Sequence, residues 1–267
     1  MNYITLNNNV KMPILGLGTS GLTGSECENS VLEAIELGYR LIDTAQMYKN
    51  EREVGNAIKM SGVPREEFFI TTKICRPNNN YEATKQAIET SLEQLQVEYI
   101  DLLLIHEPYE EAKDMYRAML EAYEAGIIRA IGISNFKTSL YQEFIKDCKV
   151  IPAVNQVEQH VFFQQDELME IMSKHGTHMQ AWSPFAKGKN DLFDNEVLKS
   201  IGEKYGKTAA QIALRFLVQS NISVVPKSSH KERMAENMDI FDFELSESDL
   251  IQLRQMNQGE SVFGWFD

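Results

Sequence analysis

Short apolar segments alternate with longer amphipathic stretches along almost the whole chain. The segments that read as buried strands are residues 14–17, 40–43, 69–73, 100–105, 130–133, 153–156, 179–182 and 223–225. The stretches with helical periodicity are residues 26–37, 51–60, 82–95, 113–125, 140–147, 166–175, 209–219 and 233–238. Strands that alternate with helices at this spacing form parallel βαβ units. Eight such units predict an α/β fold, a closed (β/α)8 TIM barrel.

Further elements lie outside these eight units. Residues 3–12 alternate apolar and polar side chains around three asparagines, which predicts an N-terminal β-hairpin. Residues 196–205 and 246–256 read as two extra helices. Ser25 and Glu28 have the spacing of a capping box for the first helix, and Gly38 is placed to end it. Because there is no Pro-, Gly- or Ser-rich linker, we expect residues 1–267 to form a single domain.

Charge and composition exclude several classes of partner. A formal net charge of −13 disfavours nucleic acid and anionic membrane surfaces. Cys27, Cys75 and Cys148 are scattered, without a CxxC pair or a Cys/His cluster, so we expect neither a disulfide framework nor a metal site. The amino terminus lacks the features of a signal peptide and no apolar run has transmembrane length. We therefore expect a cytoplasmic protein, either a monomer or a weak homo-oligomer.

A glycine motif near the amino terminus needs separate consideration. Residues 16–21 match the G-x-G-x-x-G pattern of dinucleotide-binding folds, and Asp43 follows at a suitable distance. In that fold the third glycine opens the helix that holds the pyrophosphate. Here three further residues separate Gly21 from Ser25, where the helix is expected to begin. We therefore interpret these glycines as shaping a turn.

Polar residues close three consecutive predicted strands. Asp43 ends the second strand, Lys73 ends the third and His106 follows the fourth, while Tyr48 lies in the loop after the second. Because catalytic groups of such barrels lie at the carboxyl ends of strands, and neighbouring strands are about 4.8 Å apart, we expect these side chains to converge. Any one of them would be weak evidence by itself. Cys75 lies close to them, but we favour a buried, inert thiol over a redox role.

These four side chains have the chemistry that carbonyl reduction needs. A phenol has a pKa of about 10, and a buried ammonium such as Lys73 is expected to lower the pKa of Tyr48. Asp43 would keep Lys73 charged. Tyr48 could then act as general acid, with His106 hydrogen-bonded to the carbonyl oxygen. Since no side chain delivers hydride, this chemistry requires a cofactor.

Other polar groups suggest where such a cofactor would bind. Residues 134–135 and 155–156 place amides and a hydroxyl where buried strand ends are expected, and Trp182 closes the seventh strand. Residues 226–233 form a basic, hydroxyl-rich loop on an otherwise acidic chain. This loop leads into a helix after the eighth strand, the usual phosphate site of such barrels.

On these motifs the chain resembles the aldo-keto reductase family along nearly its whole length, from residue 11 to residue 237. The matching segments are residues 38–45 with Tyr48, 50–51, 53–55, 71–73, 101–108, 132–136, 155–158 and 226–228, followed by Arg233, Glu236 and Asn237. Among its members, the chain is similar to bacterial diketogluconate, glyoxal and prostaglandin F reductases. The resemblance implies reduction of aldehydes and ketones, among them dicarbonyls and sugar-derived keto compounds, by hydride transfer from NADPH.

The resemblance also implies roles for individual residues. The catalytic residues would be Asp43, Tyr48, Lys73 and His106. NADPH would be held by Gly18, Thr19, Asp43, Ser134, Asn135, Gln156, Trp182, Ser183, Phe185, Lys227, Ser228, Ser229, Arg233, Glu236 and Asn237. A small carbonyl substrate would lie against Ser20, Met47, Tyr48, His106, Glu107 and Trp265.

Two positions depart from the family pattern, and two other functions remain open. Many members carry a bulky aromatic residue in place of Ser20 and Trp or Gln in place of Glu107, so the substrate class is in doubt. The tail is short for the family, which predicts an open pocket. An aldolase-like barrel could instead use Lys73 as a Schiff-base lysine, with the basic loop holding a substrate phosphate. A non-catalytic subunit could bind the nicotinamide only as a redox sensor.

Overall fold

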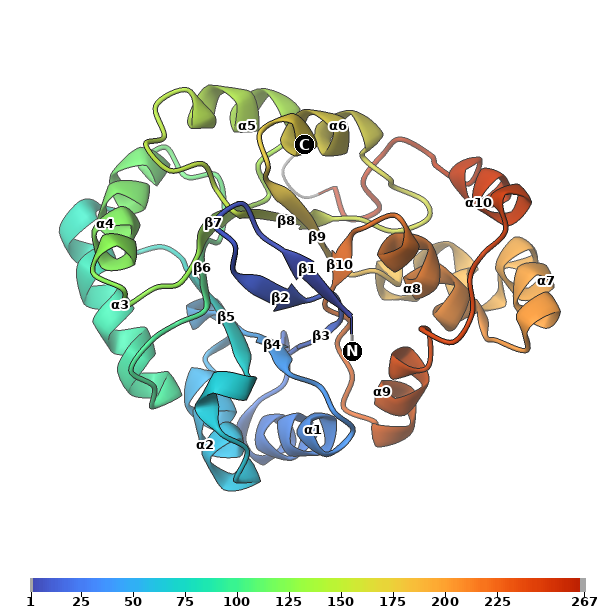
Figure 1. Ribbon diagram of the computed structural model, residues 1–267, viewed down its shortest axis with the longest axis horizontal. Coiled ribbons are helices and arrows are strands. Elements are labelled where there is room, and N and C mark those ends of the chain that lie inside the picture. Colours follow the sequence, from blue (N-terminus) through green and yellow to red (C-terminus); the bar gives the residue numbers. More distant parts are fainter. Residues whose placement is uncertain (1, 265–267) are drawn as a thin grey trace.

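Eight parallel strands form one sheet at the centre of the computed structural model, which describes residues 2–264 (Figure 1). The strands are β3 (Gly16–Gly18), β4 (Leu41–Asp43), β5 (Phe69–Ile74), β6 (Leu102–Ile105), β7 (Ile131–Ser134), β8 (Val154–Glu158), β9 (His178–Trp182) and β10 (Ser223–Val224). Each pairs with its neighbours in chain order. Parallel bridges from Leu15 to Val224 and from Gly18 to Lys227 close the sheet. The predicted (β/α)8 barrel is therefore confirmed.

An antiparallel hairpin covers one end of the barrel, as predicted. It consists of β1 (Tyr3–Thr5) and β2 (Lys11–Pro13). Its turn is tied to the barrel because Asn7 Nδ2 donates to the Ile151 carbonyl and Asn8 Nδ2 donates to the Arg129 carbonyl. These carbonyls precede β8 and β7, so the hairpin lies at the amino-terminal end of the barrel, opposite the end where catalytic groups are expected.

Helices surround the strands, because each has an apolar stripe that is buried against the sheet (Figure 1). They are α1 (Gly24–Glu36), α2 (Glu51–Ser61), α3 (Tyr81–Leu95), α4 (Ala112–Glu124), α5 (Thr138–Ile145), α6 (Asp166–Lys174), α8 (Ala209–Gln219) and α9 (Lys231–Met238). The two extra helices are α7 (Glu196–Tyr205) and α10 (Glu247–Arg254). Within the described residues, no helix combines the length and apolar character needed to cross a membrane.

The start of α1 differs from the prediction. The helix begins at Gly24, after an extended Thr23 that makes no side-chain cap, so Ser25 and Glu28 do not form a capping box. Glu28 is used elsewhere, because its carboxylate accepts a hydrogen bond from Asn56 of the neighbouring α2. The predicted stop is confirmed, since the helix ends at Glu36 and Gly38 follows with φ of 101°.

The glycines of residues 16–21 allow close packing between strands and a tight turn before α1. A Cβ atom at Gly18 would lie 2.5 Å from the Val225 carbonyl oxygen, so only glycine fits where the sheet closes. Gly16 packs equally tightly against Leu41, and Gly21 has φ of +79° in the turn before α1. The strand order is that of a closed barrel, which confirms that these glycines are not the fingerprint of a doubly wound fold.

Candidate active site

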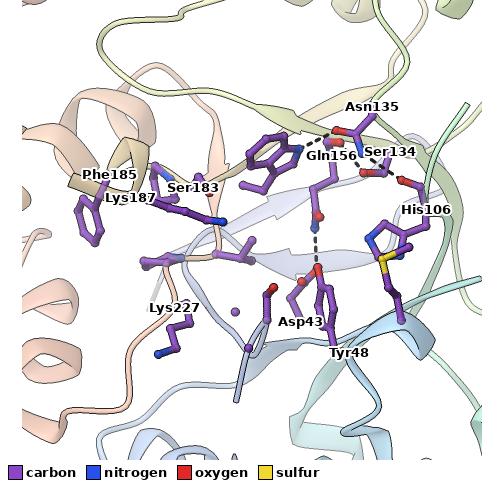
Figure 2. A pocket seen from close by; sticks show the side chains of 18 of the residues that line it. Asp43, Tyr48, His106, Ser134, Asn135, Gln156, Ser183, Phe185, Lys187 and Lys227 are labelled. Atoms are coloured by element: carbon purple, nitrogen blue, oxygen red, sulfur yellow. Dashed lines mark hydrogen bonds between the residues drawn. The ribbon is translucent and has the colours of Figure 1, made fainter. Parts of the chain in front are cut away.

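The carboxyl ends of β4, β5 and β6 bring the predicted catalytic residues together. Asp43 is the last residue of β4, Lys73 lies one residue before the end of β5, and His106 follows β6. Tyr48 closes a short 3-10 turn, η1 (Gln46–Tyr48), after β4. Asp43, Tyr48 and His106 line a cavity of about 630 Å³ (Figure 2). Lys73 lies behind this wall, completely buried.

The Lys73 ammonium is enclosed by oxygen atoms. Its Nζ atom lies 2.6 Å from Asp43 Oδ1, 3.0 Å from the Thr44 carbonyl oxygen and 3.5 Å from Tyr48 Oη. The second carboxylate oxygen of Asp43 accepts a hydrogen bond of 2.6 Å from Gln156 Nε2. Burial alone would lower the pKa of Lys73, but Asp43 and Tyr48 outweigh it and raise that pKa. Lys73 is therefore a fixed positive charge beside the phenol.

The phenol of Tyr48 does not titrate in the direction that the sequence suggested. Burial raises the pKa of Tyr48 above its ordinary value, and the Lys73 ammonium offsets this only in part. The prediction that the pKa of Tyr48 is lowered is thus wrong, because it did not include the cost of desolvating a phenolate. The consequence is that Tyr48 keeps its proton at neutral pH.

His106 is a neutral ring in the wall of the cavity. Burial, reinforced by the Lys73 ammonium, lowers the pKa of His106 to about 3. The ring packs edge-on to Tyr48, with 5.6 Å between ring centroids. Its Nδ1 atom is buried without a hydrogen-bond partner among the described residues. A neutral imidazole retains one N–H donor, so His106 can hydrogen-bond an oxygen atom beside Tyr48.

The amides expected around a nicotinamide ring line the same cavity. Ser134, Asn135, Gln156 and Trp182 all contribute to its wall. Trp182 Nε1 donates to Asn135 Oδ1 at 2.7 Å, and Asn135 Nδ2 donates to the His106 carbonyl at 3.0 Å. Asn135 takes the left-handed conformation, with φ of 65°, which asparagine tolerates well. These bonds fix the orientation of the indole and of the amide relative to His106.

The residues expected around the rest of the cofactor separate into two groups. Gly18, Ser183, Phe185 and Lys227 line the cavity (Figure 2). Thr19 does not, because its backbone N–H and its hydroxyl both donate to the Asp43 carbonyl and its side chain is completely buried. Thr19 therefore supports the position of Asp43 from behind.

The basic loop and α9 extend away from the cavity. The residues in question are Ser228, Ser229, Arg233, Glu236 and Asn237, none of which lines the cavity described above. Arg233 is exposed, whereas Ser228 and Asn237 are buried. The Ser228 hydroxyl bonds to the backbone of His230, and Glu236 accepts a hydrogen bond from the Thr208 hydroxyl at 2.5 Å. Arg233 thus presents a cation at the surface, whereas Ser228 and Glu236 bond to other groups of the protein.

Most residues expected on the substrate side line the cavity. Ser20, Met47 and Glu107 line the cavity together with Tyr48 and His106, and Trp265 lies outside the described residues. Among the wall residues that sequence reasoning missed are Lys187 and Phe193. Both come from an irregular 3-10 segment, η3 (Ala186–Asp194), whose left-handed residues give no periodic signal. Its Gly188 and clustered polar residues were the available indication of a loop.

Cys75 lies beside the site but outside the cavity wall. It is buried, and burial together with Glu107 and Glu51 raises the pKa of its thiol. A raised pKa leaves less of the reactive thiolate at neutral pH. These features favour the inert thiol.

Comparison with known proteins indicates the same family as the sequence motifs. A model of the aldo/keto reductase family matches residues 14–258. The chain is 47% identical to a glyoxal reductase of Bacillus subtilis over 97% of its own length and 94% of the relative's. It is 44% identical to a 9,11-endoperoxide prostaglandin H2 reductase of Trypanosoma cruzi, over 98% and 94% of the two lengths.

Solved structures agree over nearly the full chain. An aldo-keto reductase from a Medee basin deep-sea metagenome library superposes with a TM-score of 0.96 at 43% identity, covering 99% of this chain and 98% of that one. An aldo-keto reductase of Bombyx mori in complex with NADP superposes with a TM-score of 0.91 at 32% identity, covering 97% and 94%. By its barrel, its family match and these relatives, the chain belongs to the aldo/keto reductase family.

Proposed function

We propose that this protein reduces small aldehydes and ketones, α-dicarbonyls among them, with NADPH as the hydride donor. The observation that carries the proposal is the Lys73 ammonium, 2.6 Å from Asp43 and 3.5 Å from the Tyr48 hydroxyl, behind a cavity that Tyr48 and His106 line. The relatives support the substrate class, since one is named a glyoxal reductase and another a prostaglandin H2 reductase.

The cavity has the donor set that a nicotinamide dinucleotide needs. At one end an indole and three polar side chains, Ser134, Asn135 and Gln156, suit a flat ring that bears a carboxamide. At the other end Lys227 supplies a cation for a phosphate. The Bombyx mori relative was solved with NADP, which supports the same class of cofactor here. The bound cofactor would supply the hydride that no side chain can deliver.

Tyr48 acts as the proton donor in this proposal. Its raised pKa keeps the phenol protonated at neutral pH, so a proton is available when the carbonyl oxygen gains negative charge. The Lys73 ammonium then stabilises the phenolate that remains, and Asp43 keeps Lys73 charged. The neutral His106 ring holds the carbonyl oxygen next to Tyr48 through a hydrogen bond.

The preference for NADPH over NADH follows from two cations that lie away from the proposed nicotinamide end of the cavity. Lys227 and Arg233 are both exposed cations, one on the loop after β10 and the other on α9. A 2′-phosphate carries a larger negative charge than a 2′-hydroxyl, so two cations favour NADPH over NADH.

Steady-state oxidation of NADPH by the purified protein tests the function directly. Aldehydes, α-dicarbonyls, keto acids and quinones are compared, and we expect turnover to be fastest with small neutral aldehydes and dicarbonyls. Absence of turnover with all of them would refute the proposal. Borohydride trapping checks the Schiff-base alternative. We expect no adduct on Lys73, because its amine is charged and buried behind the cavity wall.

A further inference from the structure

The C-terminal segment of the described chain, residues 258–264, packs against the loop that follows β9. Asn190 Nδ2 in that loop donates to Gln258 Oε1 at 3.2 Å. Lys189 Nζ donates to the Val262 carbonyl at 2.5 Å. This loop is the one that supplies Lys187 and Phe193 to the cavity wall. The tail is therefore in direct contact with a loop that forms part of the cavity wall.

A buried carboxylate fastens this tail to the barrel. Glu158, the last residue of β8, is 4% exposed. Its Oε2 atom accepts a hydrogen bond of 2.5 Å from the Ser261 hydroxyl, and its Oε1 atom accepts one of 3.0 Å from the Val262 backbone N–H. Ser261 and Val262 are therefore anchored by hydrogen bonds to the two oxygen atoms of one buried side chain.

Phe263 follows this anchor and lies behind two residues of the cavity wall. Its ring centroid is 5.4 Å from that of Trp182, at an interplanar angle of 44°. Lys187 Nζ and Lys189 Nζ lie 5.3 and 4.8 Å from the same ring, within the range of cation–π attraction. Trp182 also borders a small second cavity, together with Glu158 and Ser261, so the indole separates the tail from the main cavity.

The loop that Phe263 contacts has a demanding backbone conformation. Lys187, Asn190 and Asp191 all have φ between 49° and 56°, and Gly188 has φ of 77°. Non-glycine residues keep left-handed conformations only where their surroundings hold them. In this loop the surroundings include the tail. Figure 2 shows the Lys187 side chain reaching from the side of Ser183 and Phe185 toward the middle of the cavity.

We propose that Phe263, anchored through Glu158, is a positioning residue that holds Trp182 and Lys187 against the cofactor. The inference rests on the proposed function, because it concerns the same cavity. Trp182 would face the nicotinamide ring, and Lys187 would meet the pyrophosphate, which lies between that ring and the adenosine. Since NADPH and NADH share both parts, the contacts of Phe263 with Trp182 and Lys187 act equally on the two cofactors and determine how long either stays bound.

The test is cofactor affinity and dissociation rate, measured by fluorescence titration and stopped-flow displacement on the full chain. Phe263→Ala is expected to raise the Kd of NADPH and of NADH by roughly three- to tenfold, the value of one aromatic contact. Most of the change should lie in the dissociation rate. Phe263→Tyr should restore both values, because the ring is kept.

Phe243→Ala is the matched control. The Phe243 ring has the same kind of surroundings, with Lys207 and Arg215 over it at 5.4 and 5.7 Å and Tyr205 beside it at 5.2 Å, but it does not line the cavity. It should leave both Kd values unchanged. A Kd of Phe263→Ala within about twofold of wild type, or an equal rise in Phe243→Ala, would overturn the proposal.

A second variant covers the case in which Phe263→Ala folds poorly. Lys189→Met removes the bond to the Val262 carbonyl and a cation over Phe263 without touching the cavity wall. It should also raise both Kd values, and unchanged values would count against a positioning role for Phe263. If the wild-type protein binds neither cofactor, the proposed function itself fails, which distinguishes the two outcomes.

Discussion

Replacing Tyr48 by Phe removes one oxygen atom and tests the proposed proton donor. The hydroxyl makes a long contact of 3.5 Å with Lys73 Nζ, while the ring stays packed against His106 and beneath the ammonium at 5.0 Å. Lys73 keeps its bonds to Asp43 and to the Thr44 carbonyl. The fold should therefore lose less than about 1 kcal/mol of stability.

The effect on catalysis should be much larger. General acid catalysis contributes about 10²- to 10⁴-fold, so kcat of Tyr48→Phe should fall by that factor, which corresponds to about 3–5 kcal/mol of activation free energy. The Kd of NADPH should stay near wild type, because the proton is needed only in the transition state. Single-turnover mixing of the NADPH complex with an aldehyde measures the chemical step, and thermal unfolding measures stability.

Tyr141→Phe is the control for this substitution. The Tyr141 hydroxyl is buried and lies 2.7 Å from Thr177 Oγ1, away from the cavity. This variant should lose stability and keep its rate of hydride transfer. If Tyr48→Phe retained more than about a tenth of the wild-type rate, Tyr48 would not be the acid, and the geometry around Lys73 would need another explanation.

Three further predictions follow from the same structure. Arg233→Ala should raise the Kd of NADPH roughly 10- to 150-fold and barely change that of NADH, and equal losses in a fluorescence titration would show that Arg233 does not read the phosphate. Glu107→Gln should improve kcat/KM for a keto acid relative to a neutral dicarbonyl, since a carboxylate at 4 Å opposes an anion by about 1 kcal/mol in bulk water and more where partly buried. An unchanged ratio of the two kcat/KM values would show that Glu107 does not repel anionic substrates. Burial lowers the pKa of His178 from 6.5 to about 4. Between these pH values the folded state therefore binds fewer protons than the unfolded state. The stability that the neutral ring provides is thus present above about pH 6.5 and is lost as the pH falls toward 4. Chemical denaturation across this range should show that loss, and His178→Gln should reduce the slope.

Three of the four proposed catalytic residues could be located from sequence because each terminates an apolar run. Asp43, Lys73 and His106 are polar at the ends of consecutive buried strands, and parallel pairing leaves such ends at one rim. The electrostatics could not be obtained in the same way. The pKa of Tyr48 depends on burial by segments distant in the chain, and that burial outweighs the nearby ammonium. Likewise the bond from the Thr19 hydroxyl to the Asp43 carbonyl joins the ends of two different strands, and no local pattern predicts it.

The sequence by itself determined the number and order of the strands, the hairpin, the two extra helices and the grouping of Asp43, Tyr48, Lys73 and His106, because apolar periodicity and polar strand ends are local signals. Tertiary structure decided where α1 begins, since the Glu28 carboxylate bonds to Asn56 of another helix. It also placed Lys187 in the cavity wall and Phe263 behind Trp182. These last two positions depend on left-handed loop residues and on a buried Glu158 about a hundred residues before the tail, and no local pattern encodes a contact over that separation.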